Sequence, residues 1–214
     1  MNMKRKLSAL AFLMIFGAPA FADGLVAGSA EAGKDKAISC GACHGADGNS
    51  ANPAWPSLAG QHATYIVDQL KAFKASRRTN PLMMGQVMSL SDQDMADLAI
   101  YFSEQTASPR AVADASLVDK GEALYRGGNK NNGTPACIAC HGPTGAGNPA
   151  ATYPSLSGQY ATYTAAQLRA YASGERKSDG STKVMRDIAS SLDDCGDGDG
   201  CEIEAVASYL QGLR

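Results

Sequence analysis

Aromatic residues, net charge and histidine are all scarce in this sequence. Aromatic residues make up 7% of the 214 residues and Trp55 is the single tryptophan, whereas there are 23 glycines. This balance favours loops wrapped around something other than a large apolar core. The formal net charge of -2 excludes the strongly basic surface typical of nucleic-acid-binding proteins, so we expect no nucleic-acid partner. Hydrophobic residues at 44% exclude disordered and collagen-like classes.

Long apolar runs are absent after residue 22, so no later segment is expected to cross a bilayer. The one apolar run, Leu7 to Phe16, follows three basic residues and precedes the small-x-small sequence Ala20-Phe21-Ala22. It is too short for a membrane anchor and predicts a secretory signal peptide over residues 1–22. We therefore expect a protein exported to an oxidising compartment, which is the periplasm in a Gram-negative bacterium.

The rest of the chain is a tandem repeat. The pentapeptide Cys40–His44 recurs as Cys137–His141, and the segment Pro56–Gln61 recurs as Pro154–Gln159. Internal repeats of this length indicate duplicated structural units. Pro109 interrupts the helical pattern between them, which predicts an N-terminal domain over residues 23–108 and a C-terminal domain over residues 109–214.

Alternating strand patterns are nearly absent, and the apolar spacing predicts an all-α fold. Ser91, followed by acidic residues, is typical of a helix N-cap. The expected helices cover residues 31–39, 64–75, 92–105, 117–125, 162–172 and 202–210.

Each repeat carries one Cys-x-x-Cys-His motif. Two thiols at this spacing can form thioether bonds with the vinyl groups of a haem, and the adjoining histidine can reach its iron. A thioredoxin-like redox pair would need a strand–helix–strand context, and a shared zinc site would not explain a histidine after each motif. The sequence therefore predicts two covalent haem c groups, held by Cys40 and Cys43 with His44, and by Cys137 and Cys140 with His141.

Only one further histidine, His62, could supply a sixth iron ligand. Its counterpart in the second repeat is Tyr160, so it is not part of a duplicated ligand set and is predicted to be a surface residue.

Methionine is the alternative sixth ligand. Met185 is the only methionine of the second half and precedes Leu192 by seven residues, as Met83 precedes Leu90. This match predicts Met83 and Met185 as axial ligands, each in a loop before the last helix of its unit. Met84 remains the alternative in the first unit, and Met95 is expected to fill the core.

Two prolines also repeat. Pro56 follows His44 by 12 residues, and Pro154 follows His141 by 13. The carbonyl group of each proline could hold the second ring nitrogen of the axial histidine. Alternatively, each proline only shapes a turn.

Cys195 and Cys201 lie outside the repeat, in an insertion that the first unit lacks. In an oxidising compartment two spare thiols at this spacing are expected to form a disulfide that pins the loop before the last helix.

The two motifs, the signal peptide and the repeated Pro-Ser-Leu-x-Gly-Gln segment together resemble the dihaem cytochrome c4 family. The resemblance implies two cytochrome c domains related by a pseudo-twofold axis, each a few helices wrapped around a covalent haem with His and Met ligands. It also implies a periplasmic electron carrier, loosely associated with the inner membrane. Such a carrier takes electrons from a donor such as quinol–cytochrome c reductase and passes them toward a terminal cytochrome c oxidase.

Closed coordination of both irons would suit outer-sphere electron transfer rather than catalysis. Two alternatives stay open. One is the cytochrome subunit of a periplasmic dehydrogenase of the flavocytochrome sulfide dehydrogenase type. The other is a dihaem enzyme such as a peroxidase or thiosulfate dehydrogenase, which would need an open or displaceable iron ligand. The matched methionine pair argues against the enzyme.

Overall fold

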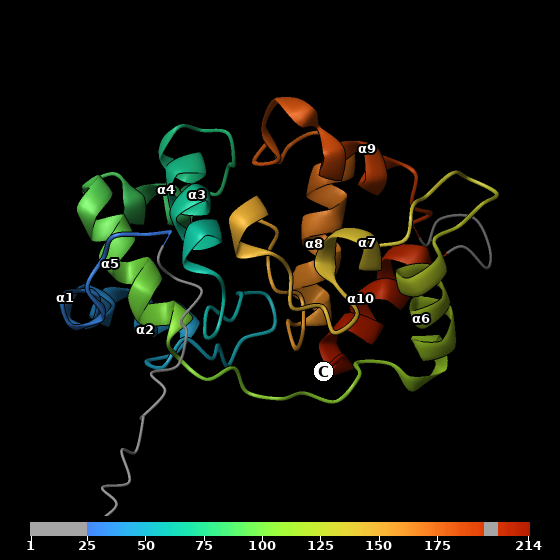
Figure 1. Cartoon of the computed structure of the whole chain (residues 1–214), viewed down its shortest axis with the longest axis horizontal. Helices are drawn as coiled ribbons and strands as arrows, with labels where there is room; N and C mark the ends of the chain where they lie inside the picture. The colour runs from blue at the N-terminus through green and yellow to red at the C-terminus, as the bar shows by residue number, and fades with distance from the viewer. Residues whose placement is uncertain (1–24, 195–200) are drawn as a thin grey trace, which may run out of the picture.

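The computed structural model describes residues 25–194 and 201–214. Over these residues the chain forms two helical lobes joined by a segment that runs beneath both (Figure 1). No β-strand occurs in these two ranges, which contain only the isolated bridges Asn129–Thr134 and Asn148–Tyr153. The all-α prediction is therefore confirmed, whereas the predicted signal peptide lies outside the described residues.

The N-terminal lobe contains five helices, and they follow the expected pattern closely. The helix expected over residues 31–39 is two helices, because the chain breaks at Ala37 before the first Cys-x-x-Cys-His motif. Ser91 and Asp94 form a reciprocal capping box that starts the last helix of the lobe. The helices are α1 (Ala30–Lys36), α2 (Ile38–His44), α3 (Ala63–Lys74), α4 (Pro81–Val87) and α5 (Asp92–Ser103).

The C-terminal lobe repeats this plan. In the first lobe α5 packs against α1 and α3, and in the second lobe α10 packs in the same way against α6 and α8. The helices are α6 (Val118–Gly127), α7 (Ile138–His141), α8 (Ala161–Ala172), α9 (Val184–Ser190) and α10 (Glu202–Gly212), with single 3-10 turns at Ala115–Leu117, Pro149–Ala151 and Gly180–Thr182.

In each lobe the first and last helices cross, and a glycine at the crossing lets their backbones approach closely. A Cβ atom on Gly33 of α1 would lie 2.1 Å from the carbonyl oxygen of Asp97 in α5. A Cβ atom on Gly121 of α6 would lie equally close, 2.1 Å, to the carbonyl oxygen of Ala205 in α10. Only glycine fits at either crossing. The two repeats therefore share this packing contact as well as their sequence motifs.

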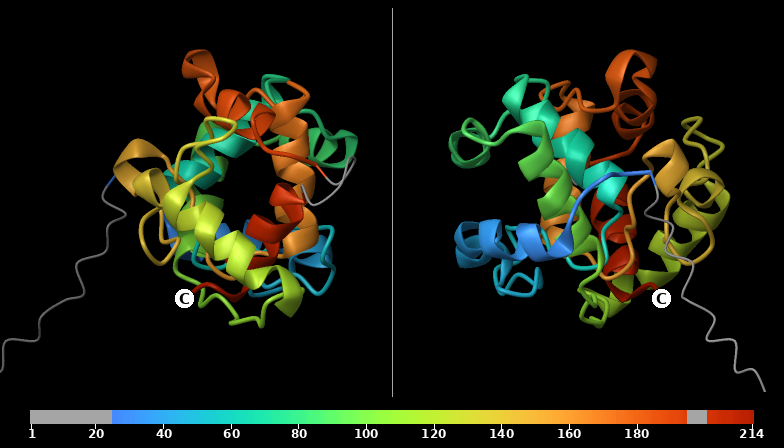
Figure 2. Two further views of the ribbon diagram at one scale, coloured as in Figure 1. Left: turned by 90° about the vertical axis from the view of Figure 1, so that its right-hand side faces the viewer. Right: turned by 60° about the vertical axis from the view of Figure 1, so that its left-hand side comes forward.

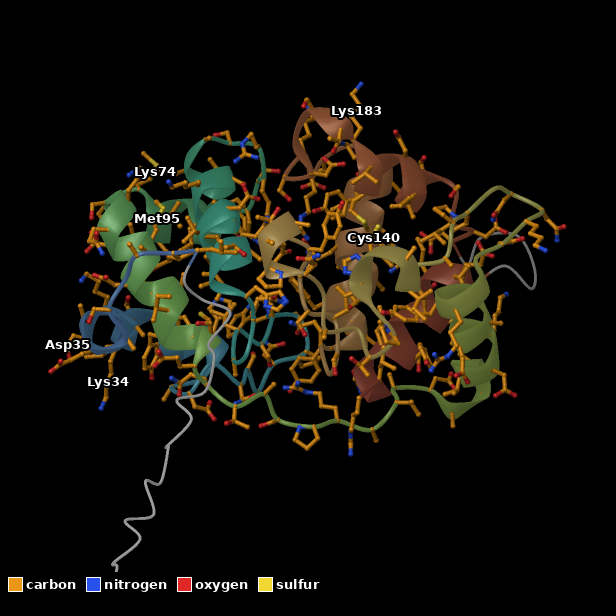
Figure 3. The ribbon with its side chains drawn as sticks, in the orientation of Figure 1. Lys34, Asp35, Lys74, Met95, Cys140 and Lys183 are labelled. Atoms are coloured by element: carbon orange, nitrogen blue, oxygen red, sulfur yellow. The ribbon has the colours of Figure 1, made fainter. Side chains whose placement is uncertain are left out.

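The cores of the lobes are made where these helices meet. Met95, labelled in Figure 3, has no exposed surface, which confirms its expected role as a core residue. Figure 1 places α3 and α8 on the facing sides of the two lobes, and the turned views of Figure 2 also show them adjacent. Across the described residues, no helix is long and apolar enough to span a membrane.

Candidate metal centres

Both Cys-x-x-Cys-His motifs lie at the end of a short helix. Helix α2 ends at His44 and α7 ends at His141, and each is followed by a glycine with positive φ, Gly45 at 83° and Gly142 at 76°. This left-handed residue stops each helix directly after the histidine. The first and fourth positions of a motif are neighbours on one helical face, so both thiols of a motif point to the same side. None of the four motif cysteines forms a disulfide, and Cys140, labelled in Figure 3, lies in α7.

The two motif histidines are oriented in the same way. Each is only 7% exposed, and His44 Nδ1 lies 2.8 Å from the carbonyl oxygen of Pro56, while His141 Nδ1 lies 3.1 Å from that of Pro154. A carbonyl oxygen can only accept, so Nδ1 carries the proton and Nε2 keeps the lone pair that binds a metal. The repeated prolines therefore orient the histidines, as the first of the two readings predicted.

Burial also shifts the pKa values of the motif residues. Desolvation lowers the pKa of His44 and of His141, so both are neutral imidazoles at neutral pH. Burial also raises the pKa of Cys40, and raises that of Cys137 to about 11. Both shifts reflect the burial of the first cysteine of each motif, whereas Cys43 and Cys140 are exposed.

Met83 and Met185 both lie in the first turn of corresponding helices, α4 and α9. Helix α4 and helix α9 each have seven residues, and a fully buried residue follows the methionine by one turn: Val87 in α4 and Ala189 in α9. Residues four apart share a helical face, so each methionine projects from the face that enters its lobe. The loop predicted for both methionines is wrong, because both lie within helices. In α4 the helix starts early because Asn80 caps it and Pro81 occupies its first turn.

Burial alone does not separate Met83 from Met84, because both are half-buried. Met84 shares its helical face with Met88, which is 61% exposed. Met83 shares its face with buried Val87. Met84, however, lies three residues before the same Val87, so the choice of Met83 rests on its match to Met185 and stays a prediction.

His62 is a partly exposed residue, as the sequence predicted, and its side chain also reaches the other lobe. Its Nε2 atom is 2.7 Å from the carbonyl oxygen of Ala146 in the other lobe. Its counterpart Tyr160 donates from its hydroxyl to the carbonyl oxygen of Ser50 at 2.8 Å, in the opposite direction. Both residues thus join the lobes across the pseudo-twofold.

Sequence reasoning missed a symmetric arginine cluster at the same interface. Arg78 donates to the hydroxyl of Tyr163 at 2.6 Å, and Arg176 donates to that of Tyr65 at 2.7 Å. Both guanidinium groups also donate to the side-chain oxygens of Gln69 and Gln167, at 2.7 to 3.0 Å. The two arginines are 98 residues apart, the same shift that relates the tyrosines and the glutamines. That shared shift was the sequence signal that could have identified them.

This cluster fits the charge of the predicted cofactor. Arg78 is 8% exposed and Arg176 is 4% exposed, and the partners that the described residues offer them are all neutral. Buried charges in folded proteins are normally paired. The propionate carboxylates of two haem groups would supply the missing negative charge, so the donor set fits haem at both motifs.

The predicted disulfide of the insertion involves Cys195, which lies outside the described residues. Cys201, at the start of α10, is disulfide-bonded. The Cys195–Cys201 pairing itself stays a prediction.

Comparison with known proteins finds the same repeat. The family model described as cytochrome c matches twice, over residues 30–105 and 118–214. A cytochrome c4 of Pseudomonas aeruginosa is 48% identical over 188 residues, which cover 88% of this chain and 90% of the relative. A thiosulfate dehydrogenase electron acceptor of Thiomonas intermedia is 37% identical over 179 residues, covering 82% of this chain and 78% of the relative. The crystal structure of reduced cytochrome c4 from Pseudomonas stutzeri superposes with a TM-score of 0.82 and 45% identity, covering 88% of this chain and all of that one.

Proposed function

Because the chain belongs to the cytochrome c family and carries two of its units in tandem, we propose that it shuttles electrons through the periplasm toward a terminal cytochrome c oxidase. Quinol–cytochrome c reductase is a donor of the required chemistry. The observation that carries this proposal is the match to cytochrome c4 over 88% of the chain and both units.

The cytochrome c4 relatives are electron carriers, so this protein is a dihaem electron carrier and not an enzyme. It binds two covalent haem c groups, one in each unit. The prediction of two haem c groups is confirmed, and the dihaem-enzyme alternative is set aside.

In this proposal each iron has two protein ligands. His44 and Met83 hold the iron of the N-terminal lobe, and His141 and Met185 hold that of the C-terminal lobe. Each bound haem supplies a one-electron Fe(III)/Fe(II) couple. A thioether ligand favours Fe(II) and raises the reduction potential, and two occupied axial positions leave no room for a substrate.

The export proposal rests on the sequence of residues 1–22, with its basic start, apolar run and small-residue end. Loose association with the outer face of the inner membrane would keep the carrier close to membrane-bound donors and acceptors.

Oxidation by a terminal oxidase tests the shuttle directly. The purified holoprotein is reduced, mixed with oxygenated membranes that contain a cytochrome c oxidase, and followed by its absorption. We expect saturable oxidation that cyanide abolishes. Oxidation no faster than in buffer would contradict the proposal.

The thiosulfate dehydrogenase electron acceptors among the relatives favour a second candidate, an electron acceptor of a periplasmic sulfur-compound dehydrogenase. This candidate is tested by mixing the oxidised holoprotein with a thiosulfate dehydrogenase and thiosulfate. Rapid reduction together with inert behaviour toward the oxidase would favour the second candidate over the first.

A further inference from the structure

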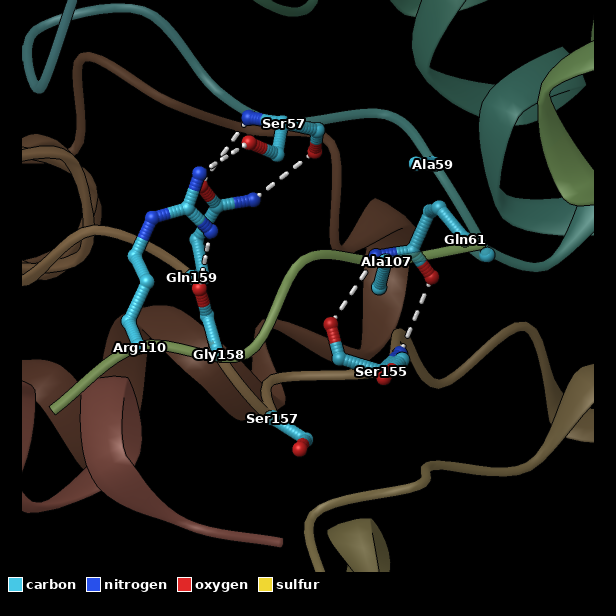
Figure 4. A pocket seen from close by; sticks show the side chains of 10 residues that line it. Ser57, Ala59, Gln61, Ala107, Arg110, Ser155, Ser157, Gly158 and Gln159 are labelled. Atoms are coloured by element: carbon cyan, nitrogen blue, oxygen red, sulfur yellow. Dashed lines mark hydrogen bonds between the residues drawn. The ribbon is translucent and has the colours of Figure 1, made fainter. Parts of the chain in front are cut away.

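The repeated Pro-Ser-Leu-x-Gly-Gln segments meet at the contact between the lobes, where each glutamine side chain forms hydrogen bonds with the backbone of the opposite segment (Figure 4). The Gln159 carboxamide donates from Nε2 to the carbonyl oxygen of Ser57 at 2.9 Å and accepts from the Ser57 N–H at 3.1 Å. Gln61 makes the same two bonds to Ser155, both at 2.9 Å. The two pairs are related by the pseudo-twofold that relates the lobes.

The peptide group that bonds to each glutamine also accepts a hydrogen bond from a proposed iron ligand, the motif histidine. The N–H of Ser57 and the C=O of Pro56 belong to one peptide group, and that C=O accepts from His44 Nδ1 at 2.8 Å. A continuous chain of hydrogen bonds therefore runs from His44 through the peptide group to Gln159 Oε1.

The equivalent series of hydrogen bonds links His141 to the N-terminal lobe. His141 Nδ1 donates to the carbonyl oxygen of Pro154 at 3.1 Å, and the N–H of Ser155 in the same peptide group donates to Gln61 Oε1 at 2.9 Å. Each axial histidine is thus connected to a glutamine of the other lobe.

Hydrogen bonds in such a chain strengthen one another. Amide resonance couples the two ends of a peptide group, so an acceptor at its N–H makes its C=O a stronger acceptor. A stronger acceptor at Nδ1–H increases the basicity of the ring nitrogen that binds the metal. A more basic imidazole stabilises Fe(III) more than Fe(II) and lowers the reduction potential.

We propose that Gln159 and Gln61 are positioning residues that act across the interface, each tuning the reduction potential of the haem in the opposite lobe. Each does so through the peptide group that holds the axial histidine. The inference rests on the proposed iron ligation by His44 and His141.

Each glutamine oxygen also accepts a hydrogen bond from a backbone N–H of its own lobe. Gln159 Oε1 also accepts from the N–H of Tyr160 at 3.1 Å, and Gln61 Oε1 accepts from the N–H of His62 at 3.0 Å. Each carboxamide oxygen is thereby held by a backbone N–H of its own lobe as well as by one of the other lobe. Both glutamines line the same small cavity between the segments.

The test compares Gln159→Met with Gln61→Met in the holoprotein. A redox titration followed by the hyperfine-shifted haem methyl resonances reports the two haem groups separately. Gln159→Met should raise the potential of the N-terminal haem alone, and Gln61→Met that of the C-terminal haem alone. We expect about a threefold change in each equilibrium constant for reduction, about 28 mV at 59 mV per tenfold change for one electron.

Tyr160→Phe is the matched control, because it removes one neutral hydrogen bond between the lobes without touching either peptide group. It should leave both potentials within error of the wild type. Equal shifts of both haem groups in a glutamine variant, a shift confined to the glutamine's own lobe, or no shift would overturn the proposal.

A measurement on the unaltered protein keeps the inference testable if the variants fold poorly. The reduced holoprotein should show a scalar coupling across the hydrogen bond between the Ser57 amide nitrogen and Gln159 Cδ. Absence of this coupling would overturn the inference. The histidine ligation is tested separately, by the ring resonances of His44 and His141, so the failure of one claim is distinct from the failure of the other.

Discussion

At the scale of single residues, the proposed methionine ligands would decide what each iron can do. Met83 and Met185 each precede a buried residue by one helical turn, whereas Met84 precedes exposed Met88. A methionine sulfur at the sixth position completes the coordination of the iron and favours its reduced state.

Replacing Met83 by Ala should therefore lower the reduction potential of the N-terminal haem by on the order of 100 mV, within the span of about 0.8 V that axial ligands control. Spectroelectrochemical titration of the holoprotein measures the change. Met84→Ala is the control and should leave the potential near that of the wild type. The opposite outcome, a large shift in Met84→Ala alone, would assign Met84 as the ligand.

At the scale of helices, the glycine crossings allow the closest approach within each lobe. Gly33 meets the backbone of α5 and Gly121 meets that of α10. Any side chain there would force the terminal helices apart, because the atom in the way is backbone rather than a flexible side chain.

Gly121→Ala should destabilise the protein by about 1–3 kcal/mol, the usual cost of overpacking a well-packed contact. Gly127, in the same helix α6, has no atom within 4 Å of its added Cβ. Gly127→Ala should leave the stability unchanged or raise it by less than about 1 kcal/mol. Urea unfolding of both variants measures the difference, and equal losses would contradict this packing.

An acid-sensitive contact ties α1 to α5. Buried Asp97 accepts from the side chain of Gln93 at 2.9 Å, from the N–H of Ser29 at 2.9 Å and from Lys36 at 3.0 Å. These hydrogen bonds, that of Gln93 first, lower the pKa of Asp97 below its ordinary value of 3.8. The second repeat has Ala205 at the corresponding position, so this contact belongs to the N-terminal lobe alone.

Since the folded-state pKa of Asp97 is lowered, its contribution to stability is complete above pH 3.8. It is lost as the pH falls through the lower folded-state value. Urea unfolding of the wild type and Asp97→Asn, from neutral pH down to about pH 2, measures it. We expect the variant to be less stable at neutral pH and the two curves to converge in acid. A constant gap at all pH values would contradict this account.

Local patterns predicted the long helices and the haem motifs but not the contacts between lobes. The helix expected over residues 64–75 is α3 at Ala63–Lys74, because apolar spacing is a local property. Helices α4 and α9 were missed because seven residues carry too short a pattern. The partner of Gln159 lies 102 residues away along the chain, so its role depends on how the lobes pack.

At the scale of the whole molecule, two buried arginines form hydrogen bonds across the interface between the lobes. Arg78 and Arg176 each donate to a tyrosine of the opposite lobe and share Gln69 and Gln167 as acceptors. The surrounding guanidinium groups also lower the pKa of Tyr163, although burial opposes its ionisation. The interface is therefore a cationic region set between two redox sites.

A fixed positive charge disfavours Fe(III), so Arg176→Met should lower the potentials of both haem groups by an energy on the order of 1 kcal/mol. Arg176→Lys keeps the charge and should recover most of the loss. The same redox titration measures both variants. This pattern differs from that of the glutamine variants, which should each raise the potential of one haem only. No change in Arg176→Met would contradict the electrostatic role.

Carbon monoxide binding to the fully reduced holoprotein tests the central claim most directly, namely that both irons are closed by protein ligands. Carbon monoxide binds ferrous haem only where an axial position is open or weakly held. With His44 and Met83 on one iron and His141 and Met185 on the other, the absorption spectrum should not change. A change in about half of the haem would mean that one iron is open, and would contradict the account of this protein as a carrier with two closed sites.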